Sequence, residues 1–134
     1  MCLLTFQKKE FVADKEMPVY KILGKDNFSP FASFLYKRGT NKPEGIRVIE
    51  HIGPNKNCKT IYGGFLHAFT NRLFAETHIG TFPGKKTRDK IVKMYVPVGA
   101  EYYISEDGTE ICATAMVWKY PCRKIIEFFK KKND

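Results

Sequence analysis

The sequence predicts an α+β fold dominated by strands, in which a twisted, mostly antiparallel sheet or a partial barrel carries one or two short helices. Two observations lead to this prediction. Short runs of β-branched and aromatic residues recur along the chain, separated by turns rich in Gly, Pro, Asn and Asp. Only one internal segment has both the start and the stop signals of a helix. The 134 residues, 43% of them hydrophobic, suffice for a single domain over 1–134.

The first half of the chain contains two predicted strands. Met17–Leu23 is the first, because its β-branched and aromatic residues run unbroken to Gly24. Residues 27–43 form a loop with four aromatic side chains, and such a loop must dock, either as a flap over the core or as a lid over a ligand. Gly45–Ile52 alternates between apolar and polar residues and predicts the second strand, with a turn at 53–57.

The run YGGFLHAF, residues 62–69, combines two glycines with three aromatic residues and a histidine. We expect a short strand that ends at Phe69 and places Phe65, His67 and Phe69 on one face. The glycines would let a backbone come close to a ligand. A helix is expected next, with Thr70 or Asn71 as its N-cap, running to about residue 78 and ended by a glycine at residue 80.

The second half of the chain predicts a basic loop, a strand and a hairpin. The loop is 81–90 and the strand is Ile91–Val98. An acidic turn at 106–108 separates the β-rich runs 101–105 and 109–118, and its Asp-Gly pair is a strong hairpin signal. Residues 124–134 form a basic C-terminal segment that is expected to fray.

The chain is strongly basic, with a formal net charge of +9. This charge favours anionic partners such as nucleotides, nucleic acid or an acidic protein surface. The alternative is that each basic cluster is only a solvated surface. One cluster comprises Lys85, Lys86, Arg88 and Lys90, just before the strand that contains Tyr95.

The four cysteines and three histidines do not form a metal-binding pattern, although scattered residues could still assemble a site. No phosphate-binding loop is present, so we expect no cofactor. The apolar run at the start is too short for a signal peptide and no stretch approaches the length of a membrane span, so we expect neither. We therefore expect free thiols in a reducing cytoplasm.

Binding is better supported than catalysis, because basic clusters lie beside aromatic residues that can stack on bases. His67 could pack in the core, contact a ligand or act as a general acid or base. A cysteine–histidine pair could be drawn from Cys58 or Cys112 with His67, but nothing local marks either thiol as activated. An aromatic edge strand would permit a homodimer. The predicted ligand contacts are Tyr62, His67, Phe69, Lys85, Lys86, Arg88 and Tyr103.

Short segments of the chain resemble a group of small uncharacterised proteins encoded in phages, prophages and gut bacteria. The segments are the Met1-Cys2-Leu3 start, 19–23, 29–31, 64–69, 96–103 and 110–113. The chain departs from the group's pattern by inserting Leu66 before His67, an insertion that would fit a β-bulge. The resemblance implies no activity. It implies a mobile-element context, in which such proteins often block host defence by binding a host protein or a nucleotide messenger.

A second resemblance is to ADP-ribosyltransferase folds, in which a histidine or arginine on an early strand is followed by an aromatic or serine motif and by a glutamate on a late strand. His67, Tyr103 and Glu110 occur in that order, but the local motifs around the last two do not match. This resemblance implies the alternative function, a small enzyme that uses His67 and Glu110.

Overall fold

The computed structural model describes residues 3–29, 34–53, 58–81 and 89–120. Within these residues strands dominate, and α1 (Arg72–Thr81) is the one α-helix, with a short 3₁₀ turn at Lys25–Asn27. The strands are β1 (Leu3–Thr5), β2 (Phe11–Val12), β3 (Met17–Leu23), β4 (Gly39–Asn41), β5 (Val48–Ile52), β6 (Cys58–Gly63), β7 (Leu66–Phe69), β8 (Lys90–Val96), β9 (Glu101–Ile104), β10 (Glu110–Ala113) and β11 (Met116–Trp118). In the described part, no helix has the length and apolar character needed to cross a membrane.

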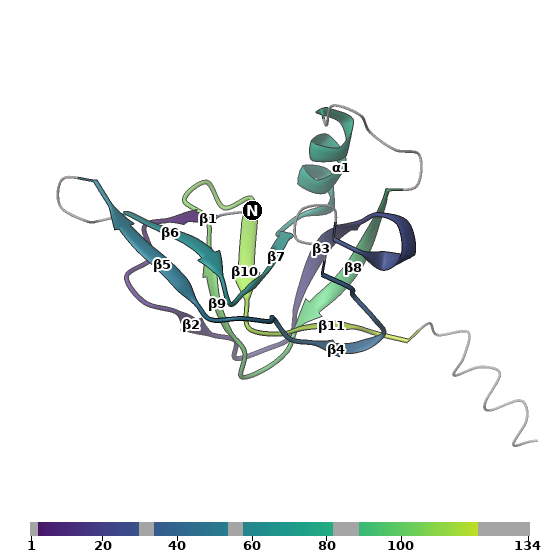
Figure 1. Ribbon diagram of the computed structural model, residues 1–134, viewed down its shortest axis with the longest axis horizontal. Helices are drawn as coiled ribbons and strands as arrows, with labels where there is room; N and C mark the ends of the chain where they lie inside the picture. Colours follow the sequence, from purple (N-terminus) through teal and green to yellow (C-terminus); the bar gives the residue numbers. More distant parts are fainter. Residues whose placement is uncertain (1–2, 30–33, 54–57, 82–88, 121–134) are drawn as a thin grey trace, which may run out of the picture.

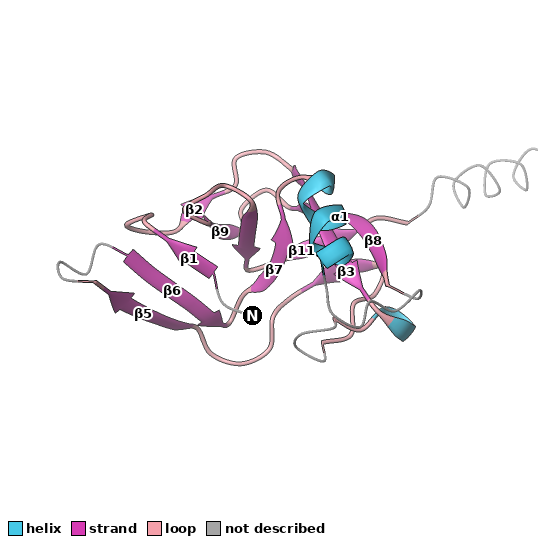
Figure 2. Cartoon of the chain, turned by 90° about the horizontal axis from the view of Figure 1, so that it is seen from above, coloured by secondary structure: helices cyan, strands magenta, loops and turns pink. Residues whose placement is uncertain are grey.

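Over the described residues the strands form two antiparallel sheets (Figures 1 and 2). The larger has eight strands in the order β2-β9-β10-β7-β3-β8-β11-β4, and the smaller has the order β1-β6-β5. The expected mostly antiparallel sheet is therefore confirmed. Neither sheet closes on itself, because β2 and β4 are the two ends of the larger one, so the partial-barrel alternative is not confirmed.

Several elements lie where the sequence predicts them. The first predicted strand is β3, and it pairs along its whole length with β8, from Met17 opposite Val96 to Leu23 opposite Lys90. Helix α1 follows β7 directly. Its N-cap is Asn71, whose side-chain oxygen accepts a 2.8 Å hydrogen bond from the backbone N–H of Leu73. The helix continues to Thr81, one residue past the glycine that was expected to end it.

Other elements differ from the prediction. Residues 109–118 were expected to form one strand, but the structure divides them into β10 and β11, which join different neighbours in the larger sheet. The division falls at Thr114, whose backbone N–H and side-chain oxygen both bond to the backbone of Glu101. The predicted strand 45–52 shortens to β5, and the aromatic loop contains the unpredicted strand β4. The basic segment 124–134 lies outside the described residues.

Strands β1, β2 and β6 were missed by sequence reasoning. The alternation in β6 is obscured by Lys59, which is buried although lysine normally marks a solvent-facing position. The Lys59 ammonium donates a hydrogen bond to the carbonyl oxygen of Lys8 and lies 5.5 Å from the centroid of the Tyr103 ring. A buried cation with these partners can be identified only once the fold has brought them together.

Among the described residues, buried apolar side chains form three clusters, and β7 together with Phe65, which precedes it, contributes to all of them. Leu66 and Ala68 pack in the largest cluster, on the inner face of the large sheet. Phe65 packs under the small sheet, and Phe69 packs under α1. The expected alternation along this strand is confirmed, and its ladder with β10 runs from Leu66 to Phe69 without the bulge that the inserted Leu66 suggested.

Candidate functional site

The structure distributes the predicted ligand contacts over different environments. Tyr62 is exposed on β6, whereas His67, Phe69 and Tyr103 are each less than 10% exposed. Phe69 belongs to the cluster under α1, and Tyr103 belongs to the cluster under the small sheet. These four side chains therefore do not form one open surface. The basic residues Lys85, Lys86 and Arg88 lie outside the described residues, so their role stays a prediction.

His67, Cys112 and Tyr103 form a row across β7, β10 and β9, because Cys112 lies opposite both of the others in register. Burial raises the pKa of the Cys112 thiol to about 12, so the thiol is protonated at neutral pH and is not an activated nucleophile. The Tyr103 hydroxyl donates a 2.9 Å hydrogen bond to a carboxylate oxygen of Glu10. This row is packed interior rather than a reactive triad.

The alternative catalytic pair, His67 and Glu110, shares one face of the sheet. Glu110 lies opposite Phe69, so it is the diagonal neighbour of His67. Burial, and secondly the charge of Asp107, raise the pKa of Glu110, and neither ring nitrogen of His67 has a hydrogen-bond partner in the described part of the chain. Because His67 is only 8% exposed, a substrate has little access to its ring. The enzyme alternative stays a prediction.

Gly64 allows the backbone of Arg47 to pass close to it. Its φ of +76° is in the left-handed region, and an added Cβ would lie 2.6 Å from the backbone N and Cα of Arg47. The Arg47 guanidinium continues across the junction between the sheets, 5.1 Å from the centroid of the Phe65 ring and 2.8 Å from a carboxylate oxygen of Glu101. Within the described residues, the backbone that comes close to this glycine is that of residue 47.

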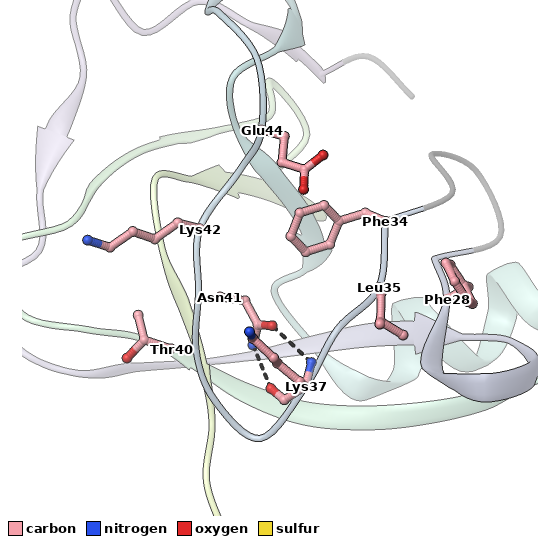
Figure 3. Close-up of a pocket in the computed structure, with 8 residues that line it drawn as sticks. All are labelled: Phe28, Phe34, Leu35, Lys37, Thr40, Asn41, Lys42 and Glu44. Carbon is pink, nitrogen blue, oxygen red and sulfur yellow. Dashed lines mark hydrogen bonds between the residues drawn. The ribbon is translucent and has the colours of Figure 1, made fainter.

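A pocket of about 510 Å³ lies in the aromatic loop. Its lining residues are Phe28, Phe34, Leu35, Lys37, Thr40, Asn41, Lys42 and Glu44 (Figure 3). Figure 3 shows the Phe34 ring and the Glu44 carboxylate turned toward each other across the two limbs of the loop, while Lys42 and Thr40 extend to the other side. The volume is within the range of about 300–1,000 Å³ that is usual for small-molecule sites.

Two buried side chains, Tyr36 and Asn41, attach the loop that forms this pocket to the rest of the fold. Tyr36 is buried in the main core, and its ring packs edge-on against Phe34 with 4.9 Å between ring centroids. Asn41 accepts a 2.9 Å hydrogen bond from the backbone N–H of Lys37 and donates to the carbonyl oxygens of Lys37 and Met116. The docking expected of this aromatic loop is confirmed for Phe34 and Tyr36, so the Phe34 ring is a fixed wall of the pocket.

A second feature is a basic part of the outer face of the large sheet on which no described element packs, and which we call the Tyr95 surface. It consists of Thr40, Lys42, Lys93, Tyr95, Val117 and Lys119. Thr40 lies opposite Val117 and Val117 lies opposite Tyr95, so these three share one face. Helix α1 packs on the other end of the same face, against β3, β7 and β8, and the lysines of the Tyr95 surface are exposed.

Two ammonium groups lie beside the Tyr95 ring. The Lys119 Nζ is 4.1 Å and the Lys93 Nζ is 5.5 Å from the ring centroid. Lys119 also contacts a carboxylate oxygen of Glu16 at 2.5 Å, and this ion pair raises the pKa of the lysine. Sequence reasoning missed these two lysines as contacts. The alternation along β8, which places Lys93 and Tyr95 on one face, was the available signal.

The inner face of β11, opposite the Tyr95 surface, carries a further pairing of cations with an aromatic ring. The Arg38 guanidinium lies 4.3 Å and the Lys90 ammonium 5.5 Å from the centroid of the Trp118 ring. Arg38 also donates a 2.6 Å hydrogen bond to the carbonyl oxygen of Lys119. Trp118 is the one tryptophan of the sequence, so its fluorescence reports on this end of the sheet.

In the described residues, no three His, Cys, Asp or Glu side chains gather as they would to hold a metal ion. Comparisons of the chain with protein-family models, with curated proteins and with solved structures found no match. The phage-type context and the ADP-ribosyltransferase alternative therefore stay predictions.

Proposed function

We propose that this chain binds single-stranded nucleic acid across the Tyr95 surface. The observation that carries the proposal is the half-buried Tyr95 ring on a sheet face that no described element covers, with the ammonium groups of Lys93 and Lys119 beside it. Proteins that bind single strands combine aromatic side chains, on which bases stack, with cations that track the phosphates. A stacked base would take the place that Lys119 occupies on the ring in the free chain, and the displaced ammonium would contact a phosphate.

The distribution of charge supports an anionic partner. Nine of the 23 Lys and Arg residues, but only two of the 14 Asp and Glu residues, lie in the segments outside the described residues. Two of these segments adjoin the strands of the Tyr95 surface in sequence: 82–88 precedes β8, and 121–134 follows β11. The predicted contacts Lys85, Lys86 and Arg88 belong to the first of them. Cations beside an aromatic stacking face favour a nucleic acid over a protein partner.

The test is binding of a short fluorescein-labelled oligouridine, followed by fluorescence anisotropy at several salt concentrations. We expect affinity to fall steeply with salt, because each neutralised phosphate releases counterions. Unlabelled single strands should compete better than a duplex, whose bases are already stacked. Absence of salt-dependent binding to any strand would exclude the proposal and would favour a protein partner.

The variant Lys93→Ala isolates the proposed surface, because within the described residues this lysine has no ion pair to lose. We expect weaker binding of every strand and a slope of log affinity against log salt that is smaller by about one. Lys9→Ala is the matched control, since it removes an equal, exposed charge between β1 and β2. Equal losses in the two variants would mean that binding responds to net charge alone.

A further inference from the structure

The pocket in the aromatic loop adjoins the Tyr95 surface, because Thr40 belongs to both. Thr40 is separated from Tyr95 only by Val117, which lies opposite each of them. Two inter-strand spacings amount to about 10 Å. Strand β4, which carries Thr40, is an edge strand of the large sheet, and Phe34 and Glu44 lie on the other side of the loop from Thr40 and Lys42 (Figure 3). A strand that stacks one base on Tyr95 and passes over Thr40 therefore reaches this edge, where a following nucleotide can turn into the pocket and Lys42 can contact its phosphate.

The interior of the pocket presents one stacking face and one acceptor. The Phe34 ring is held by Tyr36, and the Glu44 carboxylate is turned toward it from the opposite limb of the loop. Within the described residues Glu44 has no hydrogen bond or ion pair, so both of its oxygens are available to a ligand. The amide of Asn41 is already occupied by backbone partners and cannot contribute.

A carboxylate accepts hydrogen bonds and donates none, and its two oxygens match two adjacent donors. Guanine is the base whose Watson–Crick edge presents such a pair, the N1–H and the N2 amino group. Cytosine and adenine each place a ring nitrogen acceptor beside their amino group, and uracil has one N–H between two carbonyl oxygens. Resting on the proposed function, we infer that the pocket accepts one unstacked guanine of a bound single strand, stacked on Phe34 and held by Glu44.

The test compares a labelled oligouridine with the same strand carrying one central guanine. A bidentate pair is worth about ten-fold or more in discrimination, so the guanine strand should bind the natural chain at least about ten-fold more tightly. Glu44→Gln should abolish this preference and leave the salt dependence of oligouridine binding in place. Glu50→Gln, an exposed position on β5, removes the same charge and should keep the preference.

A mononucleotide arm separates this inference from the proposed function. Guanosine and uridine monophosphate are titrated by calorimetry into the natural chain and into Glu44→Gln. Strand binding without a guanine preference, or a preference that survives in Glu44→Gln, overturns the inference alone. Glu44-dependent binding of guanosine monophosphate without any strand binding would overturn the proposed function and leave base recognition in place. If neither the strands nor guanosine monophosphate bind, the inference and the proposed function are both overturned.

Discussion

His67 buries an imidazole whose two nitrogens have no hydrogen-bond partner within the described residues. Burial, and secondly the charge of Lys21, lower the pKa of His67 to about 4 from its ordinary value of 6.5. The ring is therefore neutral in the folded chain at neutral pH. Between pH 6.5 and 4 the unfolded chain binds a proton that the folded chain does not, so stability is lost as the pH falls through that window.

We expect this loss to reach about 3 kcal/mol of unfolding free energy at the acid end. Urea unfolding at several pH values measures it. His67→Leu should remove the pH-dependent part and cost little at pH 7, because it also removes an unsatisfied polar group. His51→Leu, at an exposed position on β5, should behave as the natural chain does. An acid loss that persists unchanged in His67→Leu would contradict this account.

Lys21 shows why burial of a residue was harder to predict than its place in a strand. Its position in β3 follows from the flanking β-branched residues, but its side chain is 7% exposed. Strand β7 pairs with β3 only where Phe69 lies opposite Tyr20, so the His67 carbonyl oxygen has no backbone partner on β3. It accepts a 2.7 Å hydrogen bond from Lys21 Nζ. Burial lowers the pKa of this lysine to about 8. The residues around Lys21 in the sequence do not indicate which carbonyl oxygen lacks a strand partner.

At the scale of elements, the start of α1 depends on the side chain of Asn71. Asn71→Ala should lower the unfolding free energy by about 1 kcal/mol, because one N–H of the first helical turn loses its acceptor. Asn71→Ser retains an acceptor at the same position and should remain close to the natural chain. Thermal and urea unfolding compare the three proteins. Equal stability of the alanine and serine variants would show that the cap contributes nothing.

The elements that the sequence predicted well are those whose signals are local. Period-two alternation predicted β8 and the two faces of β7, and cap chemistry predicted the start of α1. The run 109–118 was predicted as one strand because its composition is uniform, and only the hydrogen bonds between Thr114 and Glu101 divide it. The pocket of the aromatic loop depends in the same way on Asn41, which attaches the loop to β11.

At the scale of the whole molecule, two connections between the sheets pass close to each other: Gly64 lies between β6 and β7, and Arg47 lies between β4 and β5. Gly64→Ala should lower the unfolding free energy by about 2–4 kcal/mol, because it combines a positive φ with a clash against backbone atoms. Gly99→Ala is the matched control: its φ is +89°, but an added Cβ would meet nothing within 4 Å. The control should cost about 1 kcal/mol from its backbone conformation alone.

Chemical denaturation of the two alanine variants separates conformational strain from steric overlap. Equal losses at Gly64 and Gly99 would mean that the close approach of Arg47 relaxes at no cost. A much larger loss at Gly64, with unchanged denaturant dependence, would show that the junction of the two sheets is rigid in the folded chain. The same junction includes the contact of Arg47 with Glu101, which joins the segment before β5 to β9.

The sequence by itself determined the strand-rich class, the positions of β3 and β8, the alternation through His67 and the basic charge that favours an anionic partner. The strand positions and the alternation follow from backbone preference and side-chain period, which act over a few residues. The class and the charge follow from composition, which does not depend on contacts. The tertiary structure decided which aromatic residues stay accessible. Tyr103 and Phe69 became core, while Tyr95 remained half-buried beside exposed lysines, because burial depends on pairings between segments far apart in sequence.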